Sequence, residues 1–322
     1  MWYKLALQVG STMYGIHVKI QPDFNSKNYK TLENALAKTI QEYPTFKAIQ
    51  IFTHGPKHKY RNNYNATDIK NLVDKHKIKL FIHAPYIPTD GIWNALSTGD
   101  SSKQTKYINI LQELINATDE IGALGLVIHI TKQPPEIIAK VMKQIQSNIT
   151  NPSNIKIILE MKAMKPDPNL SYETAAKSNR LCEVLSDLSM QWGLCIDTSH
   201  LWACGIDISN IKIISSWFDE FKYPKKLLLF HLNGASYSTF GKGKDTHIIP
   251  FSKDDDIWNK LTKKKEDYDN ITNAEWQNIK KSSFGIIMHY AKINKIPFVC
   301  EMNRGKEFEM DYFIDILDGL FY

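Results

Sequence analysis

Eight short apolar runs recur along the chain, and each is followed by a longer stretch with apolar residues every three to four positions. The short runs lack strict polar alternation, which is typical of parallel strands covered by helices on both faces of the sheet. We predict strands at residues 3–9, 48–52, 79–83, 124–130, 156–160, 194–197, 227–232 and 297–301. We predict helices at residues 32–42, 66–76, 102–121, 136–149, 172–188, 206–221, 275–292 and 309–320.

Eight strand–helix units that close on themselves form a (β/α)8 TIM barrel, so we expect residues 1–322 to fold as a single α/β domain. A hydrophobic content of 43% is sufficient for one large core. An open doubly wound sheet is the alternative, but the first predicted strand lacks the glycine-rich turn of a dinucleotide-binding fold. A charged insertion at 252–270 interrupts the alternation, and it is either a solvated loop or short surface helix, or a lid over the active face.

Composition limits the partners and the compartment. The balance of 40 Lys and Arg against 34 Asp and Glu gives a net charge of +6, which suits a polyanionic partner without requiring one. Neither an export signal nor an apolar run of membrane-spanning length is visible. We therefore expect a monomer in an intracellular, reducing compartment (the cytoplasm, the nucleus or a viral replication site), neither secreted nor in a membrane. The four cysteines lie far apart and are expected to be buried, reduced thiols: Cys182, Cys195, Cys204 and Cys300.

The segment 193–206, GLCIDTSHLWACGI, places two functional side chains just after a predicted strand. Its apolar run stops at Asp197, and His200 follows three residues later. The carboxyl ends of the strands form the active face of a barrel, which favours a catalytic or binding role for this pair. A helix-capping Asp beside a packed His explains the same pattern equally well.

Other ionisable residues follow the remaining strands, and together they decide between these interpretations. A lone His in an apolar run is usually a core residue. Nine ionisable side chains on one rim of a barrel, histidines and carboxylates together, are hard to explain by packing alone. Burying them uncompensated is costly, and metal coordination is the usual compensation. Nitrogen and oxygen ligands fit Zn²⁺ or Mn²⁺, and nine ligands suffice for two or three ions, an arrangement suited to displacement at phosphorus. The candidate metal ligands are His83, His129, Glu160, Asp197, His200, His231, Asp245, His247 and Glu301.

The motifs around these residues read, in order, HAPY, LVIHI, ILE, CIDTSH, HLN, KDTH and CEM. Over residues 83–301 they resemble the endonuclease IV family (AP endonuclease family 2) of the xylose-isomerase-like TIM barrel superfamily. The resemblance implies a zinc-dependent hydrolase of base excision repair, which cleaves duplex DNA 5′ to an abasic site and leaves a 3′-hydroxyl. A hydroxide held between the metals would be the nucleophile.

The resemblance also implies how three zinc ions would share the ligands. His83 and His129 would hold the first ion, with Glu160 as a bridge to the second. Asp197, His231 and Glu301 would complete the second site. His200, Asp245 and His247 would hold the third ion. Glu160 or Glu301 would orient the attacking water as the catalytic carboxylate.

The resemblance points to DNA contacts in two places. Tyr86, directly after HAP, matches a position where the family places an aromatic ring against DNA, although a core role at the rim explains it equally well. The loop after the second predicted strand contains basic residues that suit salt-sensitive binding of backbone phosphates, or that are simply solvent-facing. These residues are Lys57, His58, Lys59 and Arg61.

Four departures from the family pattern leave the ligands in place. The family's first strand usually contains a His before Val-Ser, where residues 8–11 read QVGS. After the bridging glutamate, residues 161–164 read MKAM instead of Asn-Thr-Ala-Gly. Gly234 replaces the Asp that follows HLN, and residues 248–251, IIPF, replace a glycine-containing turn. These positions concern the support of the ligands and the grip on DNA.

Two other functions compete with this one. A metal-dependent sugar isomerase or epimerase of the same superfamily also has Glu, Asp and His at its strand ends, but it would leave His200, Asp245 and His247 without a role. A DNA-binding barrel that has lost catalysis would be expected to lack some of the ligands, whereas all nine positions are occupied.

Overall fold

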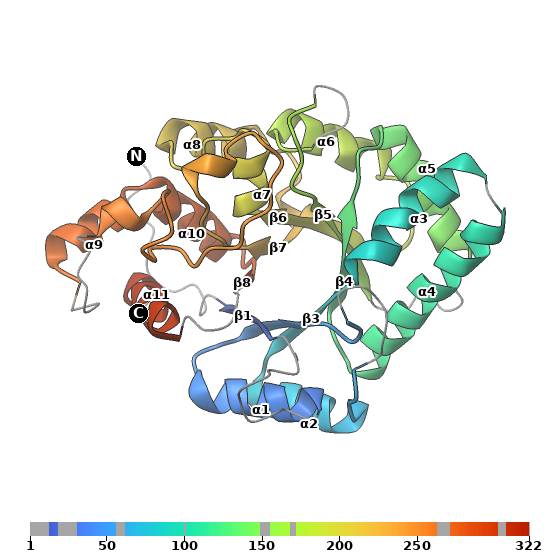
Figure 1. Cartoon of the computed structure of the whole chain (residues 1–322), viewed down its shortest axis with the longest axis horizontal. Coiled ribbons are helices and arrows are strands. Elements are labelled where there is room, and N and C mark those ends of the chain that lie inside the picture. The colour runs from blue at the N-terminus through green and yellow to red at the C-terminus, as the bar shows by residue number, and fades with distance from the viewer. Residues whose placement is uncertain are drawn as a thin grey trace.

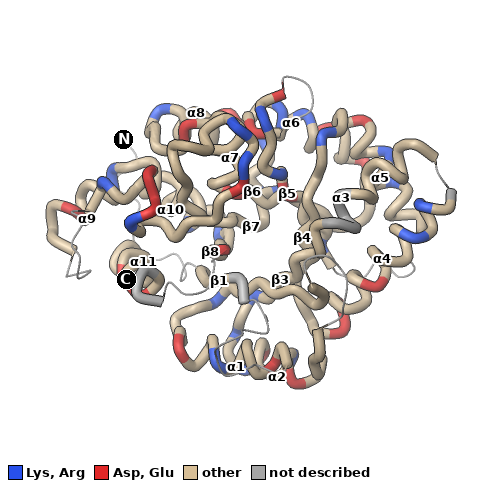
Figure 2. Tube along the Cα trace, viewed as in Figure 1, with Lys and Arg blue, Asp and Glu red and all other residues tan. Residues whose placement is uncertain are grey.

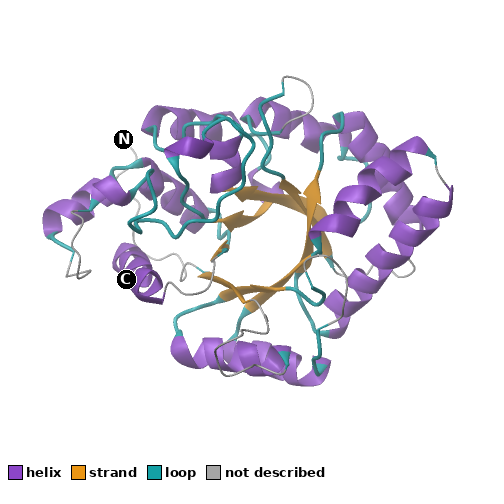
Figure 3. Ribbon diagram, viewed as in Figure 1, coloured by secondary structure: helices purple, strands orange, loops and turns teal. Residues whose placement is uncertain are grey.

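The computed structural model describes residues 13–18, 31–55, 62–99, 101–148, 155–167, 172–262, 271–301 and 307–321. These residues form a closed barrel of eight parallel strands with helices around it (Figures 1 and 3). Each strand pairs with the next in sequence, and β1 pairs with β8 to close the ring. The predicted TIM barrel is confirmed.

Seven of the eight predicted strands have counterparts at nearly the predicted bounds. The strands are β1 (Tyr14–Val18), β2 (Ala48–Ile51), β3 (Lys79–His83), β4 (Gly125–Ile130), β5 (Lys156–Met161), β6 (Trp192–Asp197), β7 (Leu227–His231) and β8 (Phe298–Cys300).

The first strand was predicted wrongly. It is β1 that closes the barrel, whereas residues 3–9 lie outside the described part of the chain. The run at 3–9 has the stronger apolar pattern, while β1 contains a glycine and a histidine, which lower strand propensity. A β-carbon on Gly15 would overlap the Ala48 carbonyl, so the close approach of β1 to β2 requires glycine there. Because β1 ends in His17 and Val18, the expected absence of a His-Val pair from the first strand is also wrong.

The helices pack outside the strands (Figure 3). They are α1 (Leu32–Glu42), α2 (Ala66–His76), α3 (Tyr86–Thr98), α4 (Ser101–Glu120), α5 (Pro135–Asn148), α6 (Ala175–Val184), α7 (Thr198–Ala203), α8 (Ile211–Glu220), α9 (Asn273–Lys280), α10 (Ser283–Ile293) and α11 (Glu307–Phe321). The prediction missed α3 and α7, and it joined α9 and α10 into one helix. These two are separate because the Ser282 hydroxyl caps α10 by accepting from the Gly285 N–H.

The insertion at 252–270 is not a solvated loop over its described half, residues 252–262. Asp255, Ile257 and Trp258 are almost completely buried there, with exposed fractions of 0–1%. The Asp255 carboxylate accepts hydrogen bonds from the backbone N–H groups of Phe251, Ile257 and Trp258. The solvated-loop interpretation fails because these polar groups satisfy one another inside a packed turn. Residues 263–270 lie outside the described part.

The strand pleat arranges the barrel interior in layers. One layer is apolar and consists of Ala48, Phe81, Val127, Ile158, Cys195, Leu229 and Val299. Successive side chains of a strand point to opposite faces, so the residue two positions later points inward again, nearer the carboxyl end. That next layer consists of Gln50, His83, His129, Glu160, Asp197, His231 and Glu301, all of which are buried. The fold thus gathers six of the nine candidate ligands at one level.

Candidate metal centre

Glu160 lies at the middle of the polar layer and faces four imidazoles. Its Oε2 is 3.2 Å from His83 Nε2 and 3.4 Å from His129 Nε2. Its Oε1 is 3.0 Å from His231 Nδ1 and 3.3 Å from His200 Nδ1. Burial acts to raise the pKa of Glu160, but His231 and His129 outweigh it and hold that pKa well below the ordinary value. Glu160 is therefore an anion with imidazoles on both oxygens, the arrangement of a bridging carboxylate.

A second group of side chains surrounds His231. Its Nδ1 is 3.8 Å from Asp197 Oδ2 and 3.8 Å from Glu301 Oε1, in addition to the contact with Glu160. Burial acts to lower the pKa of His231, but Cys195, Glu160 and Glu301 outweigh it and raise that pKa well above the ordinary value. Carboxylates thus outnumber the positive groups around this ring, and their field attracts a cation.

The third group lies where β6 leads into α7 and includes residues of the loop after β7. His247 Nε2 is 3.0 Å from Asp245 Oδ1 and 3.7 Å from Asp197 Oδ2, and His200 Nε2 is 3.4 Å from the same Asp245 oxygen. Burial acts to lower the pKa of His247, but Glu301 and Asp245 outweigh it and raise that pKa to about 9. The three residues predicted to share an ion are therefore close together, with Asp197 beside them.

Asp197 serves two purposes that the sequence left as alternatives. Its Oδ1 accepts a hydrogen bond from the His200 N–H at 3.0 Å and so caps α7. Its Oδ2 faces His231 and His247. The spacing of three residues places a cap donor and a second imidazole on the first turn of α7, so capping and site formation use one carboxylate.

These residues fit a metal ion. Within the described part of the chain, three buried imidazole nitrogens make no well-aligned hydrogen bond: His129 Nδ1, and also His200 Nε2 and His247 Nε2, which face carboxylate oxygens only as ion-pair contacts. His83 Nδ1 is 2.7 Å from the Ala84 carbonyl and His200 Nδ1 is 2.6 Å from the Met161 carbonyl, so both donate N–H there and direct Nε2 into the site, where a metal ion would take its lone pair. Ligand atoms of four three-residue groups lie within 4.8 Å of one another, and the groups are His83–His129–Glu160, Glu160–Cys195–His231, Asp197–His200–His247 and Asp197–His231–Glu301.

Three residues of the site were not among the predicted ligands. Asn233 donates to Asp197 Oδ2 at 2.8 Å and accepts from the Glu301 N–H at 2.9 Å. Gln50 contacts Glu301 and His231. The thiol of Cys195 lies in this cluster, and burial raises its pKa to about 12. Two sequence features could have pointed to these amides: Asn233 belongs to the HLN motif, and Gln50 is a lone amide in an apolar strand.

Tyr86 lies against the candidate ligands. Its ring centroid is 5.2 Å from that of His83 and 5.3 Å from that of His129, and Phe52 lies 5.6 Å away on another side. Burial and the neighbouring Glu301 and Glu160 carboxylates raise the pKa of Tyr86, so its hydroxyl stays protonated. The ring is thus part of the wall of the site, and a contact with DNA stays a prediction.

The predicted basic loop with Lys57, His58, Lys59 and Arg61 lies outside the described residues. Over the described part, basic and acidic positions are interspersed along the helices (Figure 2). No helix of this part combines the length and apolar character needed to cross a membrane.

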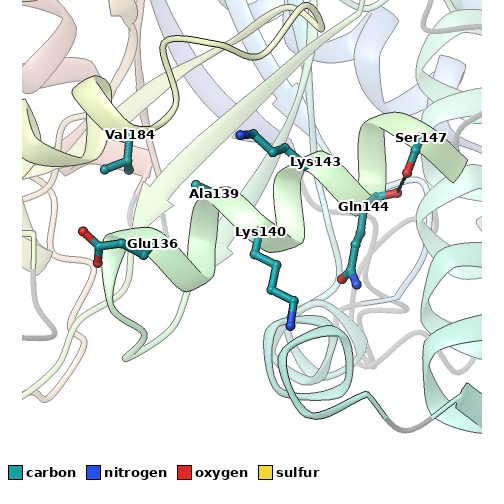
Figure 4. A pocket seen from close by; sticks show the side chains of 7 residues that line it. All are labelled: Glu136, Ala139, Lys140, Lys143, Gln144, Ser147 and Val184. Atoms are coloured by element: carbon teal, nitrogen blue, oxygen red, sulfur yellow. Dashed lines mark hydrogen bonds between the residues drawn. The ribbon is translucent and has the colours of Figure 1, made fainter.

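A surface hollow of about 680 Å³ lies away from this cluster, beside α5 and α6 (Figure 4). Most of its lining comes from α5, with Val184 opposite. Its one acid, Glu136, is paired with Arg180 at 2.7 Å. This hollow contains no group of possible metal ligands, so the barrel mouth is the candidate site.

Comparison with known proteins agrees with this geometry. Residues 38–287 match the family model described as xylose isomerase-like TIM barrel, and the chain belongs to that family. A probable AP endonuclease of African swine fever virus (isolate Tick/Malawi/Lil 20-1/1983) is 25% identical over 274 residues, which cover 82% of each chain. A probable endonuclease 4 of Mycoplasma mobile is 26% identical over 244 residues, which cover 72% of this chain and 79% of the relative.

Solved structures share the fold. The crystal structure of AsfvAP:AG has a TM-score of 0.77 at 22% identity and covers 97% of this chain and 100% of its own. A D-tagatose 3-epimerase-like protein has a TM-score of 0.56 at 14% identity, covering 96% of each chain. At such identities the likeness establishes the barrel and leaves the chemistry to the site.

Proposed function

We propose that this protein is a zinc-dependent AP endonuclease that cleaves the phosphodiester 5′ to abasic sites in duplex DNA. The observation that carries the proposal is the third group, in which His200 and His247 both lie within 3.4 Å of Asp245 Oδ1, beside Asp197. A sugar isomerase or epimerase needs no such group. The names of the relatives, probable AP endonuclease and probable endonuclease 4, favour the same activity.

The nine side chains would hold up to three ions, either Zn²⁺ or Mn²⁺. Such ions supply Lewis acidity, lower the pKa of water towards ~7 and neutralise charge on the phosphate and leaving oxygen. His83, His129 and Glu160 form one end of the cluster, and His200, Asp245 and His247 form the other. Asp197, His231 and Glu301 lie between them.

The protein's own groups would orient the reactants. The Glu160 and Glu301 carboxylates are buried acceptors that both face His231 Nδ1, so either could accept a hydrogen bond from water and aim it at phosphorus. Tyr86 keeps a protonated hydroxyl beside His83 and His129 and excludes water from that side. An abasic nucleotide leaves the helix easily because its base stacking is lost, which brings its phosphate within reach of a recessed site.

The test is incision of a duplex oligonucleotide that contains one tetrahydrofuran abasic analogue. The zinc-loaded protein should nick the modified strand once, 5′ to the lesion, and leave a 3′-hydroxyl that a polymerase extends. Glu160→Gln should abolish nicking. Glu275→Gln is the matched control, because Glu275 is also buried but caps α9 with Thr272. Intact DNA under zinc-replete conditions, together with turnover of a ketose, would support the isomerase instead.

A further inference from the structure

Among the described residues of the polar layer, Gln50 is the one member whose side chain is not ionisable. It lies on β2, is completely buried, and follows Ala48 of the apolar layer by two positions. The other six members of that layer are candidate metal ligands. Gln50 therefore occupies the place of a ligand, but its amide is a poor ligand for zinc beside imidazoles and carboxylates.

The contacts of Gln50 fix which way its amide points. The side-chain Nε2 is 2.7 Å from Glu301 Oε1, and the side-chain Oε1 is 2.9 Å from His231 Nε2. An ionised carboxylate only accepts hydrogen bonds, so the NH₂ end must face Glu301. The amide oxygen then faces His231, and because this oxygen only accepts, His231 Nε2 must carry a proton.

The other ring nitrogen of His231 faces the candidate site. His231 Nδ1 is 3.0 Å from Glu160 Oε1 and 3.8 Å from both Asp197 Oδ2 and Glu301 Oε1. An imidazole that keeps its proton on Nε2 can release the one on Nδ1 and offer that lone pair to a cation. The same amide leaves Glu301 Oε2 directed at His247 Nε2, 3.3 Å away.

We propose that Gln50 is a positioning residue of the metal centre: one amide holds the proton on His231 Nε2 and orients Glu301. This inference rests on one part of the proposed function, the metal at the site, and not on the incision of DNA. It adds a role for a side chain that touches two candidate ligands from a strand that supplies none among the described residues. Loss of a hydrogen-bond partner behind a metal ligand typically weakens metal affinity by about 10–100-fold.

The test compares Gln50→Met with wild type for zinc affinity, measured by competition with a chromogenic chelator. Met keeps the volume of the side chain and removes these two hydrogen bonds. The affinity of the protein for the zinc ion that His231 binds should therefore fall by about 10–100-fold. The matched control is Asn179→Leu, because Asn179 is also a buried amide that bridges two groups, the Glu220 carbonyl and the Lys222 N–H. The control should lose stability and keep its zinc affinity.

A second readout tests the proton on His231 directly. In zinc-loaded protein with ¹⁵N-labelled histidine, the His231 ring should show a proton on Nε2 and none on Nδ1. If Gln50→Met does not fold, Gln50→Asn keeps the amide but is too short to reach both partners, and it should show a smaller loss of affinity.

Three results would overturn the inference: unchanged zinc affinity in both Gln50 variants, an equal loss in Asn179→Leu, or a proton on His231 Nδ1. Failure of wild type to bind zinc would overturn it too. Wild type that binds zinc and does not incise abasic DNA would remove the proposed function and leave the role of Gln50 standing.

Discussion

The carboxylate of Asp255 fills the space that a side chain at Gly234 would need: a β-carbon there would lie 2.5 Å from Asp255 Oδ1. Gly234 follows Asn233 of the metal centre, and Asp255 holds the turn that ends in Trp258. Gly234 stands where an Asp was expected from the family pattern. The chain instead brings a carboxylate to this point from the insertion, and glycine makes room for it.

Gly234→Ala should therefore displace Asp255 and loosen its three backbone contacts. We expect a loss of about 1–3 kcal/mol in the free energy of unfolding, the usual range for overpacking a buried site. Urea titrations of Gly234→Ala, Asp255→Ala and the double variant provide the measurement. If the clash is the cause, the double variant loses less than the sum of the single losses. Strict additivity would show that the two positions act separately.

Stability should fall with rising pH because of Asp255. Burial raises the pKa of this carboxyl to about 7, against the lowering effect of the backbone N–H groups, whereas the ordinary pKa of an Asp side chain is 3.8. Between these two pKa values the folded state binds more protons than the unfolded state. The contribution of Asp255 to the free energy of unfolding therefore falls as pH rises from about 4 to about 7, and it is constant above that. The total reaches about 4 kcal/mol. Asp255→Asn should flatten this part of the profile in urea titrations, and an unchanged slope would contradict the assignment.

Removal of His200 should remove one ion. His200 is the residue of the third group that α7 supplies, and its Nε2 faces the Asp245 carboxylate at 3.4 Å. We expect elemental analysis to find three zinc ions per wild-type chain and two in His200→Ala. His76→Ala, on α2 outside the barrel, should keep three. Equal counts in wild type and His200→Ala would refute a third site there.

Removal of the metal ions by a chelator should lower the melting temperature, because the buried carboxylates of the cluster then lack the cations that balance their charge. Ligand bound only to the folded state adds about 2.7 kcal/mol when its concentration is 100 times its dissociation constant. Thermal unfolding with zinc and with excess chelator should therefore differ in wild type and differ less in His200→Ala. A chelator-insensitive melting temperature would show that the site holds no ion under these conditions.

The Tyr86 ring should contribute to DNA binding separately from its hydroxyl. Tyr86→Phe keeps the packing on His83 and His129, so we expect full zinc content and nearly unchanged affinity for abasic duplex. Tyr86→Ala should weaken that affinity about tenfold, a typical effect of losing one aromatic contact to a nucleotide. Fluorescence anisotropy at fixed zinc content measures both. Equal affinities of all three proteins would assign Tyr86 to the wall of the site alone.

Lys57 and Arg61 should make the DNA affinity salt-dependent. If each neutralises one phosphate, Lys57→Ala with Arg61→Ala lowers the slope of log affinity against log salt by about 1.8. Lys140→Ala with Lys143→Ala, on the exposed face of α5 (Figure 4), removes the same charge elsewhere and should keep the slope. Two equal slopes for the pairs would exclude the 57–61 loop from the interface.

Most of the fold followed from local patterns. Helices α1 and α2 begin and end where their apolar periodicity does. The prediction failed where tertiary contacts override propensity, as at β1, where Gly15 packs on Ala48. It failed again at α7: the strand does end at Asp197 as predicted, but the short helix that Asp197 caps was missed, and a helix was expected only from residue 206.

The candidate ligands were predictable because titratable residues at strand ends are unusual in apolar runs. The groups that hold them were not. Gln50 and Glu301 are 251 residues apart, and Asn233 joins Asp197 to the backbone of Glu301. An amide carries no charge, so a search of the sequence for ionisable residues does not single it out. Its hydrogen-bond partners lie on strands far away in the sequence and come close only when the barrel closes.

The alternation of apolar and polar layers has a consequence for how such a chain can change over time. Loss of one residue inside β5 would turn Leu159 toward the barrel interior and Glu160 toward the helices, because the pleat has a period of two. A substitution alters one ligand. A one-residue register shift instead reverses the orientation of every side chain that the strand contributes to the candidate site. Length changes are therefore tolerable only between strands, where this chain has its insertion.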